Sequence, residues 1–354
     1  MESIVYVPVL KSKQSELRAL KYLEAEIKNK ILPLIDLAAP STDQDLADPV
    51  SYVEKSILKL GDHLNKFKHV ILDSSELESD FRVTGNVHPL RAAAEALQGA
   101  VDSVIPTTGL SRDMAHLNAL IEICELSRND IICIRLDAYD LETPSETANN
   151  FNNFVNEHLK NYKVIVLLDF ECVYGFESAL ISEKVIRIEQ KLDIPNKIFT
   201  AVIGCGIPKN IKQAVGARSS GYIPRVEVEA FNQLNSKKHN GKFVFGDYAI
   251  VNPQYVQLDY RIINKVMGPK IFYALSNAWF VIRGGSFDAH PDKYNQYYDL
   301  AKEVSKLPDF SGGDYSYGDQ YIELRSNDDG STGNPASWLV AGINRHVTFS
   351  AKYF

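Results

Sequence analysis

Short runs of apolar residues, each ended by a polar residue, recur along the whole chain. The runs are rich in Ile and Val and do not alternate with polar residues, which is typical of parallel strands buried on both faces. The pattern predicts strands at Ile4–Leu10, Ile31–Leu37, His69–Asp73, Ser103–Thr107, Ile131–Asp137, Val164–Asp169, Ile198–Gly204 and Lys242–Asp247.

Segments with helical periodicity separate these runs. In "SELRALKYLEAEI", residues 15–27, the leucines and the final isoleucine fall on one helical face. The strands follow one another at about thirty residues, the size of one strand–helix unit. Eight such units predict a closed (β/α)8 barrel of the TIM type. An open doubly wound sheet is the alternative, but no GxGxxG phosphate loop follows the first strand.

The chain after the eighth predicted strand departs from this repeat. "KIFYALSNAWFVIRGG" indicates a β-hairpin, which we expect as an insertion near 270–284 over one mouth of the barrel. "DAHPDKYNQYYDLAKEVSKL" is expected to supply the last helix. We predict a barrel domain over 1–307 and an irregular C-terminal cap over 308–354, because this tail is rich in Gly, Ser, Asp and aromatic residues.

Five of the predicted strands carry an aspartate at or next to their last residue. In a (β/α)8 barrel the carboxyl ends of all strands open onto one face, where the catalytic groups of such enzymes lie. The sequence therefore predicts an acidic bowl formed by Asp36, Asp73, Asp137, Asp169 and Asp247.

Carboxylates gathered in this way suit two kinds of chemistry. Hard divalent cations prefer several carboxylate oxygens, so we expect a metal among these acids, with Asp36 and Asp73 as ligands. Paired acids can also transfer protons, and we assign catalytic roles to Asp137, Asp169 and His346.

Cations accompany the acids in the predicted bowl. Arg binds phosphate in a bidentate manner, so Lys11, Arg135 and Arg283 are expected to hold a phosphate-bearing small molecule such as a nucleotide. Asp247 and Asp319, each preceded by Gly, complete the predicted ligand-binding set. This hypothesis describes a hydrolase or lyase.

The same residues also allow a structural interpretation. Asp is a common helix N-cap, and every loop after a barrel strand leads into a helix. The acids could equally pair with Arg. In that case the chain is a non-catalytic barrel that senses a ligand or binds another protein, and fold class alone does not separate the two hypotheses.

Composition limits the remaining classes of function. The chain of 354 residues is 45% hydrophobic, enough for a sizeable core, and its net charge of -7 argues against a nucleic-acid-binding protein. The start of the sequence does not have the pattern of a signal peptide, and no apolar run approaches the ~20 residues of a membrane span. We expect a cytoplasmic protein without a membrane partner.

Several segments resemble, in order, the phage protein-beta family and its bacterial relatives. They are "VYVPVLKSKQSELRALKYL", "ILPLID", "FGDYA", "WFVIRGG", "GDQYI" and "NRHV", and they span nearly the whole chain. The resemblance implies a soluble barrel with a role in phage–host conflict, including anti-phage defence. It assigns no catalytic role to any residue. The residues that carry it are Lys11, Gln14, Glu16, Asp36, Asp247, Arg283, Asp319 and His346.

Overall fold

Eight parallel strands close into a barrel in the computed structural model, which describes residues 1–236, 242–254 and 267–354. Strand β1 pairs with both β2 and β9, which closes the ring. The order around the barrel confirms the predicted (β/α)8 fold, and each predicted run overlaps one observed strand. These strands are β1 (Tyr6–Lys11), β2 (Leu34–Asp36), β3 (His69–Asp73), β4 (Ser103–Thr108), β5 (Ile131–Leu136), β6 (Lys163–Cys172), β7 (Lys197–Cys205) and β9 (Phe243–Asp247).

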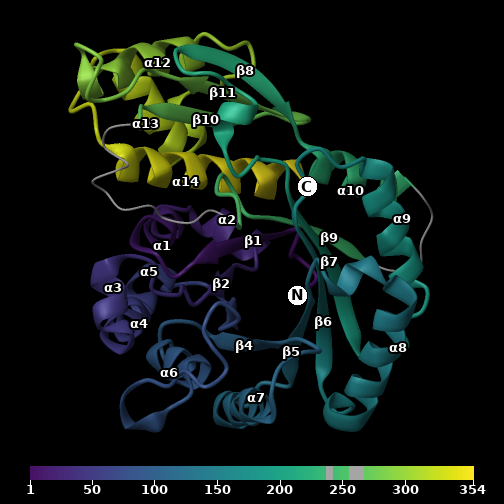
Figure 1. The fold of residues 1–354 in the computed structure, drawn as a ribbon. Coiled ribbons are helices and arrows are strands. Elements are labelled where there is room, and N and C mark those ends of the chain that lie inside the picture. Colours follow the sequence, from purple (N-terminus) through teal and green to yellow (C-terminus); the bar gives the residue numbers. More distant parts are fainter. Residues whose placement is uncertain (237–241, 255–266) are drawn as a thin grey trace.

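Helices cover the outside of the barrel (Figure 1). They are α1 (Gln14–Lys21), α2 (Ala25–Lys30), α3 (Asp43–Ala47), α4 (Pro49–Leu58), α5 (Leu60–Leu64), α6 (Pro89–Ala96), α7 (Met114–Ser127), α8 (Pro144–Phe154), α9 (Ser178–Glu189) and α10 (Val226–Ser236). The segment 15–27 forms parts of two helices, because a turn in which Leu23 N donates to Leu20 O separates α1 from α2. Capping side chains fix where other helices begin. Asp113, for example, accepts the His116 N–H at 2.8 Å and caps the start of α7.

Helix α14 (Pro335–Tyr353) completes the ring of helices. It contacts α1 and β1, and Phe354 beyond its end stacks on Phe245 of β9, with ring centroids 4.0 Å apart. Asn334 and Ser337 form a capping box that fixes its start. The expectation that the segment 288–307 supplies the last barrel helix is therefore wrong. That segment contains α12 (Gln296–Ser305), which contacts the hairpin and not the barrel strands.

A small antiparallel sheet forms a cap, and α14 lies between this cap and the barrel (Figure 1). The predicted hairpin is confirmed as β10 (Lys270–Ala274) and β11 (Ala278–Arg283). A third strand, β8 (Ser219–Pro224), comes from the loop after β7 and pairs with β11. The sequence pattern did not indicate β8, because "SSGYIP" is mostly polar and solvent-exposed.

The two faces of the cap sheet belong to different cores. Ile271 and Phe280 face α12 and α13 (Tyr317–Ser326), together with Trp338 of α14. Phe272 and Val281 on the other face join the hydrophobic core of the barrel. The cap is thus attached to the barrel by apolar packing as well as by the chain.

The C-terminal cap is mostly helical, so the prediction of an irregular segment is wrong. The Gly- and Asp-rich stretch "SNDDGSTGNP" connects α13 to α14 and does not represent the whole tail. The average composition of 308–354 masked the buried positions of its helices, such as Ile322 and Ile343. Helices α12 and α13, on either side of the predicted boundary between 1–307 and 308–354, pack against each other. Within the described ranges, no helix has the length and apolar character needed to cross a membrane.

Candidate functional site at the barrel mouth

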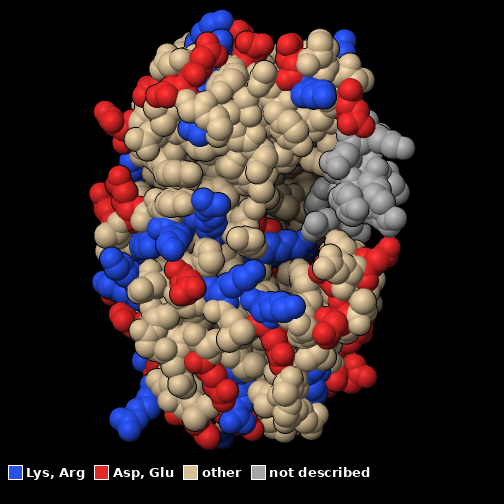
Figure 2. Space-filling view, turned by 90° about the vertical axis from the view of Figure 1, so that its left-hand side faces the viewer, with Lys and Arg blue, Asp and Glu red and all other residues tan. Residues whose placement is uncertain are grey.

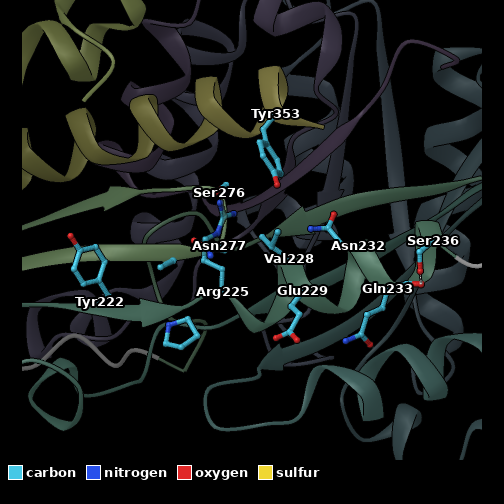
Figure 3. Close-up of a pocket in the computed structure, with 12 residues that line it drawn as sticks. Tyr222, Arg225, Val228, Glu229, Asn232, Gln233, Ser236, Ser276, Asn277 and Tyr353 are labelled. Atoms are coloured by element: carbon cyan, nitrogen blue, oxygen red, sulfur yellow. Dashed lines mark hydrogen bonds between the residues drawn. The ribbon is translucent and has the colours of Figure 1, made fainter. Parts of the chain in front are cut away.

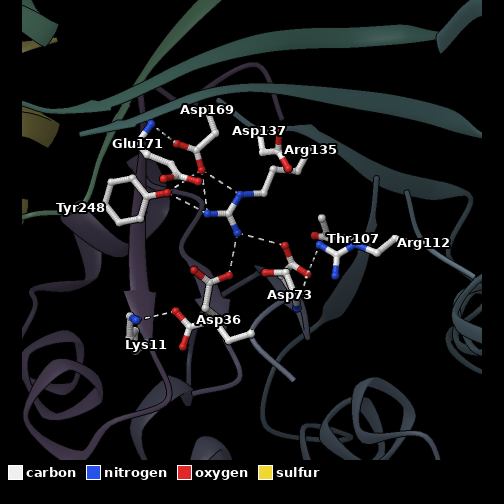
Figure 4. Close-up of polar contacts among 12 residues, drawn as sticks. Lys11, Asp36, Asp73, Thr107, Arg112, Arg135, Asp137, Asp169, Glu171 and Tyr248 are labelled. Atoms are coloured by element: carbon white, nitrogen blue, oxygen red, sulfur yellow. Dashed lines mark hydrogen bonds and ion pairs between the residues drawn. The ribbon is translucent and has the colours of Figure 1, made fainter. Parts of the chain in front are cut away.

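Arg135 of β5 lies at the centre of an ion-pair cluster at the carboxyl ends of the strands (Figure 4). Its Nη1 donates to Asp36 Oδ1 at 2.7 Å and to Asp73 Oδ2 at 3.0 Å. Its Nε donates to Asp169 Oδ2 at 2.8 Å. Parallel pairing places Lys11, Asp36 and Asp73 level on three neighbouring strands. The closed barrel therefore brings Arg135 and three of the predicted acids together.

Tyr248, directly after β9, completes this arrangement. Its hydroxyl donates to Asp169 Oδ2 at 2.5 Å and accepts a hydrogen bond from Arg135 Nη2 at 2.8 Å. We call Asp36, Asp73, Arg135, Asp169 and Tyr248 the mouth cluster. Sequence reasoning gave Tyr248 no role, since only the closed ring brings β9 near β5 and β6. The "FGDY" motif was the one signal that pointed to it.

Burial and neighbouring charges give the acids of the mouth cluster different pKa values. Burial raises the pKa of Asp36 to about 7, against the opposing effect of Arg135. Burial also disfavours ionised Asp73, but Arg112 and Arg135 outweigh it and lower the pKa of this carboxyl. The cluster therefore contains one carboxyl that is partly protonated near neutral pH beside one that stays ionised.

Further charges surround the mouth cluster. Lys11 forms an ion pair with Glu76, and its backbone N–H donates to Glu16 Oε2 at 2.7 Å. Arg112 Nη2 lies 3.4 Å from Asp73 Oδ1. Lys11 and Arg112 are partly exposed, unlike the nearly buried Arg135. Figure 2 shows a hollow between the cap and the barrel with Lys and Arg side chains at its edge.

The strand-end aspartates have a second, local role that the sequence analysis anticipated only as helix capping. Four of them accept a hydrogen bond from the backbone N–H two residues further on, each at 2.9 Å, which forms an Asx turn. Three of these turns lie at a strand end, and that of Asp169 lies at the irregularity near the end of β6. The pairs, acceptor first, are Asp73 with Ser75, Asp137 with Tyr139, Asp169 with Glu171 and Asp247 with Ala249.

Asp137 lies apart from the mouth cluster's hydrogen bonds. Its side chain is exposed and accepts the N–H groups of Tyr139 and Asp140. None of the hydrogen bonds or ion pairs that the structure gives Arg135 involves Asp137, although the two share a strand end. The geometry thus favours a turn-forming role for Asp137, and its predicted catalytic role remains untested.

The predicted metal site is not supported by the arrangement of the acids. In the described ranges no group of three or more His, Cys, Asp or Glu side chains is placed to hold a metal ion. The guanidinium of Arg135 occupies the position between Asp36, Asp73 and Asp169 that a cation would take, and forms ion pairs with all three.

Asp247 and His346 meet in a second buried cluster. His346 Nε2 lies 2.7 Å from Asp247 Oδ2, and Tyr6 donates its hydroxyl proton to Asp247 Oδ1 at 2.5 Å. Arg225 Nη2 also donates to Asp247, at 3.3 Å. Burial lowers the pKa of His346, against the effect of Asp247, so the imidazole is neutral near pH 7. We call Tyr6, Arg225, Asp247 and His346 the junction cluster, because it ties α14 and the loop before α10 to β1 and β9.

The two remaining ligand-binding candidates lie in the cap. Asp319 accepts hydrogen bonds from Tyr273 at 2.8 Å and from Ser316 at 2.6 Å, and Arg345 Nε lies 3.7 Å from it. Arg283 ends β11, where its Nη1 donates to the carbonyl of Val215. Neither has a direct contact with the mouth cluster among the described residues, so the fold distributes the predicted site over three places.

An open groove of about 740 Å³ lies between α10 and the turn of the cap hairpin (Figure 3). Asn232, Asn277 and Tyr353 line it, and Arg225 connects it to the junction cluster. Sequence reasoning missed this groove because its walls come from α10, the cap hairpin and the end of α14, which are far apart in the chain.

Comparison with known proteins identifies a family. None of the curated proteins compared matches this chain. The model of the Beta protein family matches residues 6–352, nearly the whole chain, which confirms the resemblance found in the sequence: the chain belongs to the Beta protein family.

Proposed function

We propose that the barrel mouth binds a small phosphate-bearing molecule, such as a nucleotide, and hydrolyses it. The observation that carries this proposal is the convergence of Asp36, Asp73 and Asp169, from three different strands, on Arg135. Catalytic groups of (β/α)8 enzymes come from several strand ends in this way. The cluster also holds carboxyls of unlike proton affinity, which general acid–base catalysis requires.

Asp36 is the proposed general acid. Burial raises its pKa to about 7, so part of the protein carries a proton on this carboxyl at neutral pH. Glu171 is the proposed base, because burial raises its pKa as well and it lies near the end of β6, two residues after Asp169. In the step, the water oxygen bonds to phosphorus while Glu171 takes the water proton. The bond from phosphorus to the leaving oxygen breaks, and that oxygen takes the proton of Asp36.

Lys11 and Arg112 are the proposed phosphate ligands of the mouth. Both are partly exposed. Lys11 forms an ion pair with Glu76, and Arg112 forms one with Asp73 of the mouth cluster. Arg135 is not the phosphate ligand in this proposal, since its nitrogens already donate to three carboxylates and to Tyr248. Its role is to hold the acids in position.

The test is release of inorganic phosphate from a panel of nucleotides and sugar phosphates, with Asp36→Asn and Glu171→Gln as variants. Asp193→Asn is the matched control, because Asp193 is exposed before β7, at the opposite end of the barrel. Removing a general acid or base lowers kcat by about 10²–10⁴-fold. We expect that loss in both site variants and wild-type turnover in the control.

A second candidate function is a non-catalytic barrel that binds a phage or host protein. The observation in its favour is that the three carboxylates around Arg135 are all paired with it, as in a purely structural ion-pair network. Absence of phosphate release from every compound, together with unchanged melting temperature in their presence, would support this function and exclude the hydrolase.

A further inference from the structure

Two cations face each other across the cap hairpin. Lys270 of β10 lies directly opposite Arg283 of β11, so their side chains share one face of the sheet. Like charges in this position destabilise a sheet unless something compensates them. Among the described residues, neither side chain forms an ion pair with an acid: Arg283 donates to the carbonyl of Val215, and the Lys270 ammonium lies 5.6 Å from the centre of the Phe272 ring.

Arg283 is buried and Lys270 is half-buried on the face of the sheet that also carries Phe272 and Val281. Those two side chains join the barrel core, so this face is turned toward the barrel. Arg283 is only 9% exposed. Burial lowers the pKa of Lys270, and the charge of Arg283 lowers it further. The arrangement keeps two positive charges close together where water screens them poorly.

A third cation lies at the same end of the sheet. Arg218 directly precedes β8, and its N–H donates to the carbonyl of Gly284 at 3.3 Å. A Cβ at Gly285 would lie 2.9 Å from Arg218 Nε, so the absence of a side chain there lets the guanidinium approach the backbone. The turn after β11 therefore places Arg218 next to the strand end that carries Arg283.

We propose that Lys270 and Arg283, with Arg218, form a binding site for a phosphate group on the cap. A phosphate dianion would compensate the like-charge pair, accepting bidentate hydrogen bonds from a guanidinium and a further one from the ammonium. This site is distinct from the phosphate ligands proposed at the mouth, Lys11 and Arg112, and does not depend on the proposed hydrolysis.

The test uses inorganic phosphate as the probe, against sodium chloride at equal ionic strength. Lys270→Glu places an internal anion opposite Arg283. We expect phosphate to raise the melting temperature of the wild type more than that of this variant, whose melting temperature in chloride should already exceed the wild-type value. Calorimetric titration should show phosphate binding weakened on the order of tenfold or more, since a hydrogen bond to a charged group is lost.

Two comparisons keep this test specific. Lys160→Glu makes the same charge change before β6, at the opposite end of the barrel, and should respond to phosphate like the wild type. Arg112→Gln alters the mouth and should also retain the phosphate response at the cap. An undiminished phosphate response in Lys270→Glu, or a lower melting temperature of that variant in chloride, would overturn the proposal.

Discussion

Arg135 Nη1 and Asp36 Oδ1 lie 2.7 Å apart, although the two residues are 99 positions apart in the chain. The contact crosses the inside of the barrel from β5 to β2, and it holds only while the ring is closed. The mouth cluster is therefore both a candidate site and a part of the fold, and substitutions in it should affect stability as well as activity.

Replacing Arg135 with Met should be among the most destabilising single changes at the mouth. The variant leaves Asp36, Asp73 and Asp169 buried without their shared cation, which costs about 3–5 kcal/mol of unfolding free energy at pH 7. Urea denaturation measures the loss, and it should be smaller at pH 5, where the carboxyls take up protons. Arg187→Met is the control, since its exposed pair with Glu183 contributes less than about 1 kcal/mol. Equal losses in both variants would contradict the assignment.

Glu16→Gln should stabilise the protein at alkaline pH. Burial raises the pKa of Glu16 to about 7 from an ordinary value of 4.5, so the folded state holds a proton more tightly than the unfolded state does. Wild-type stability from this group therefore falls as the pH rises from about 4.5 to about 7. The amide keeps an acceptor for the Lys11 N–H and does not ionise.

The gain of Glu16→Gln over the wild type should be near zero at pH 4.5 and reach the order of 1–3 kcal/mol above pH 7. Thermal and urea unfolding at several pH values measure this difference. A gain that is independent of pH would show that ionisation of Glu16 does not limit stability.

Asp247→Asn should weaken the junction cluster. The substitution removes the negative charge that faces buried Arg225, while Tyr6 and the Ala249 N–H keep an oxygen acceptor. Loss of one partner of a buried ion pair costs about 3 kcal/mol, and we expect a loss of that size in urea unfolding. Asp193→Asn, on the surface, should cost less than about 0.5 kcal/mol. If Asp247→Asn is as stable as the wild type, apolar packing and not the ion pair stabilises this junction.

Variants of Asp137 distinguish a role in the local turn from a role in catalysis. Asp137→Asn keeps an oxygen acceptor for the turn formed with Tyr139, whereas Asp137→Ala removes it and should cost about 0.5–2 kcal/mol, as the loss of a capping side chain does. If the residue serves only the turn, turnover should stay at the wild-type level in both variants. Phosphate-release rates that fall at least a hundredfold in Asp137→Asn would instead support the catalytic role predicted from the sequence.

The sequence was sufficient to predict the barrel because each buried parallel strand needs a continuous apolar run, and that requirement is local. It also marked where strands end, since an Asp that accepts the N–H two residues on stops a strand within its own neighbourhood, as Asp73 does with Ser75. The Asp36 strand end is different: Ser12, from the neighbouring strand end, accepts the Ala38 N–H at 3.0 Å. Here the turn depends on a residue 26 positions away.

The partners of the polar side chains could not be predicted in the same way. Asp247 and Asp169 both end apolar runs and look alike in the sequence, yet Asp169 binds Arg135 and Asp247 binds His346 and Arg225. Likewise, the sequence analysis did not predict α14, and only the structure shows that this helix completes the ring.

By itself, then, the sequence determined the eight barrel strands and the cap hairpin, and that acids stand at the strand ends, because backbone periodicity and turn chemistry act over a few residues. Only the tertiary structure decided that Arg135 takes the centre of the mouth and that Lys270 faces Arg283. These pairings depend on strand order, register and barrel closure, which bring together charges that are distant in the chain.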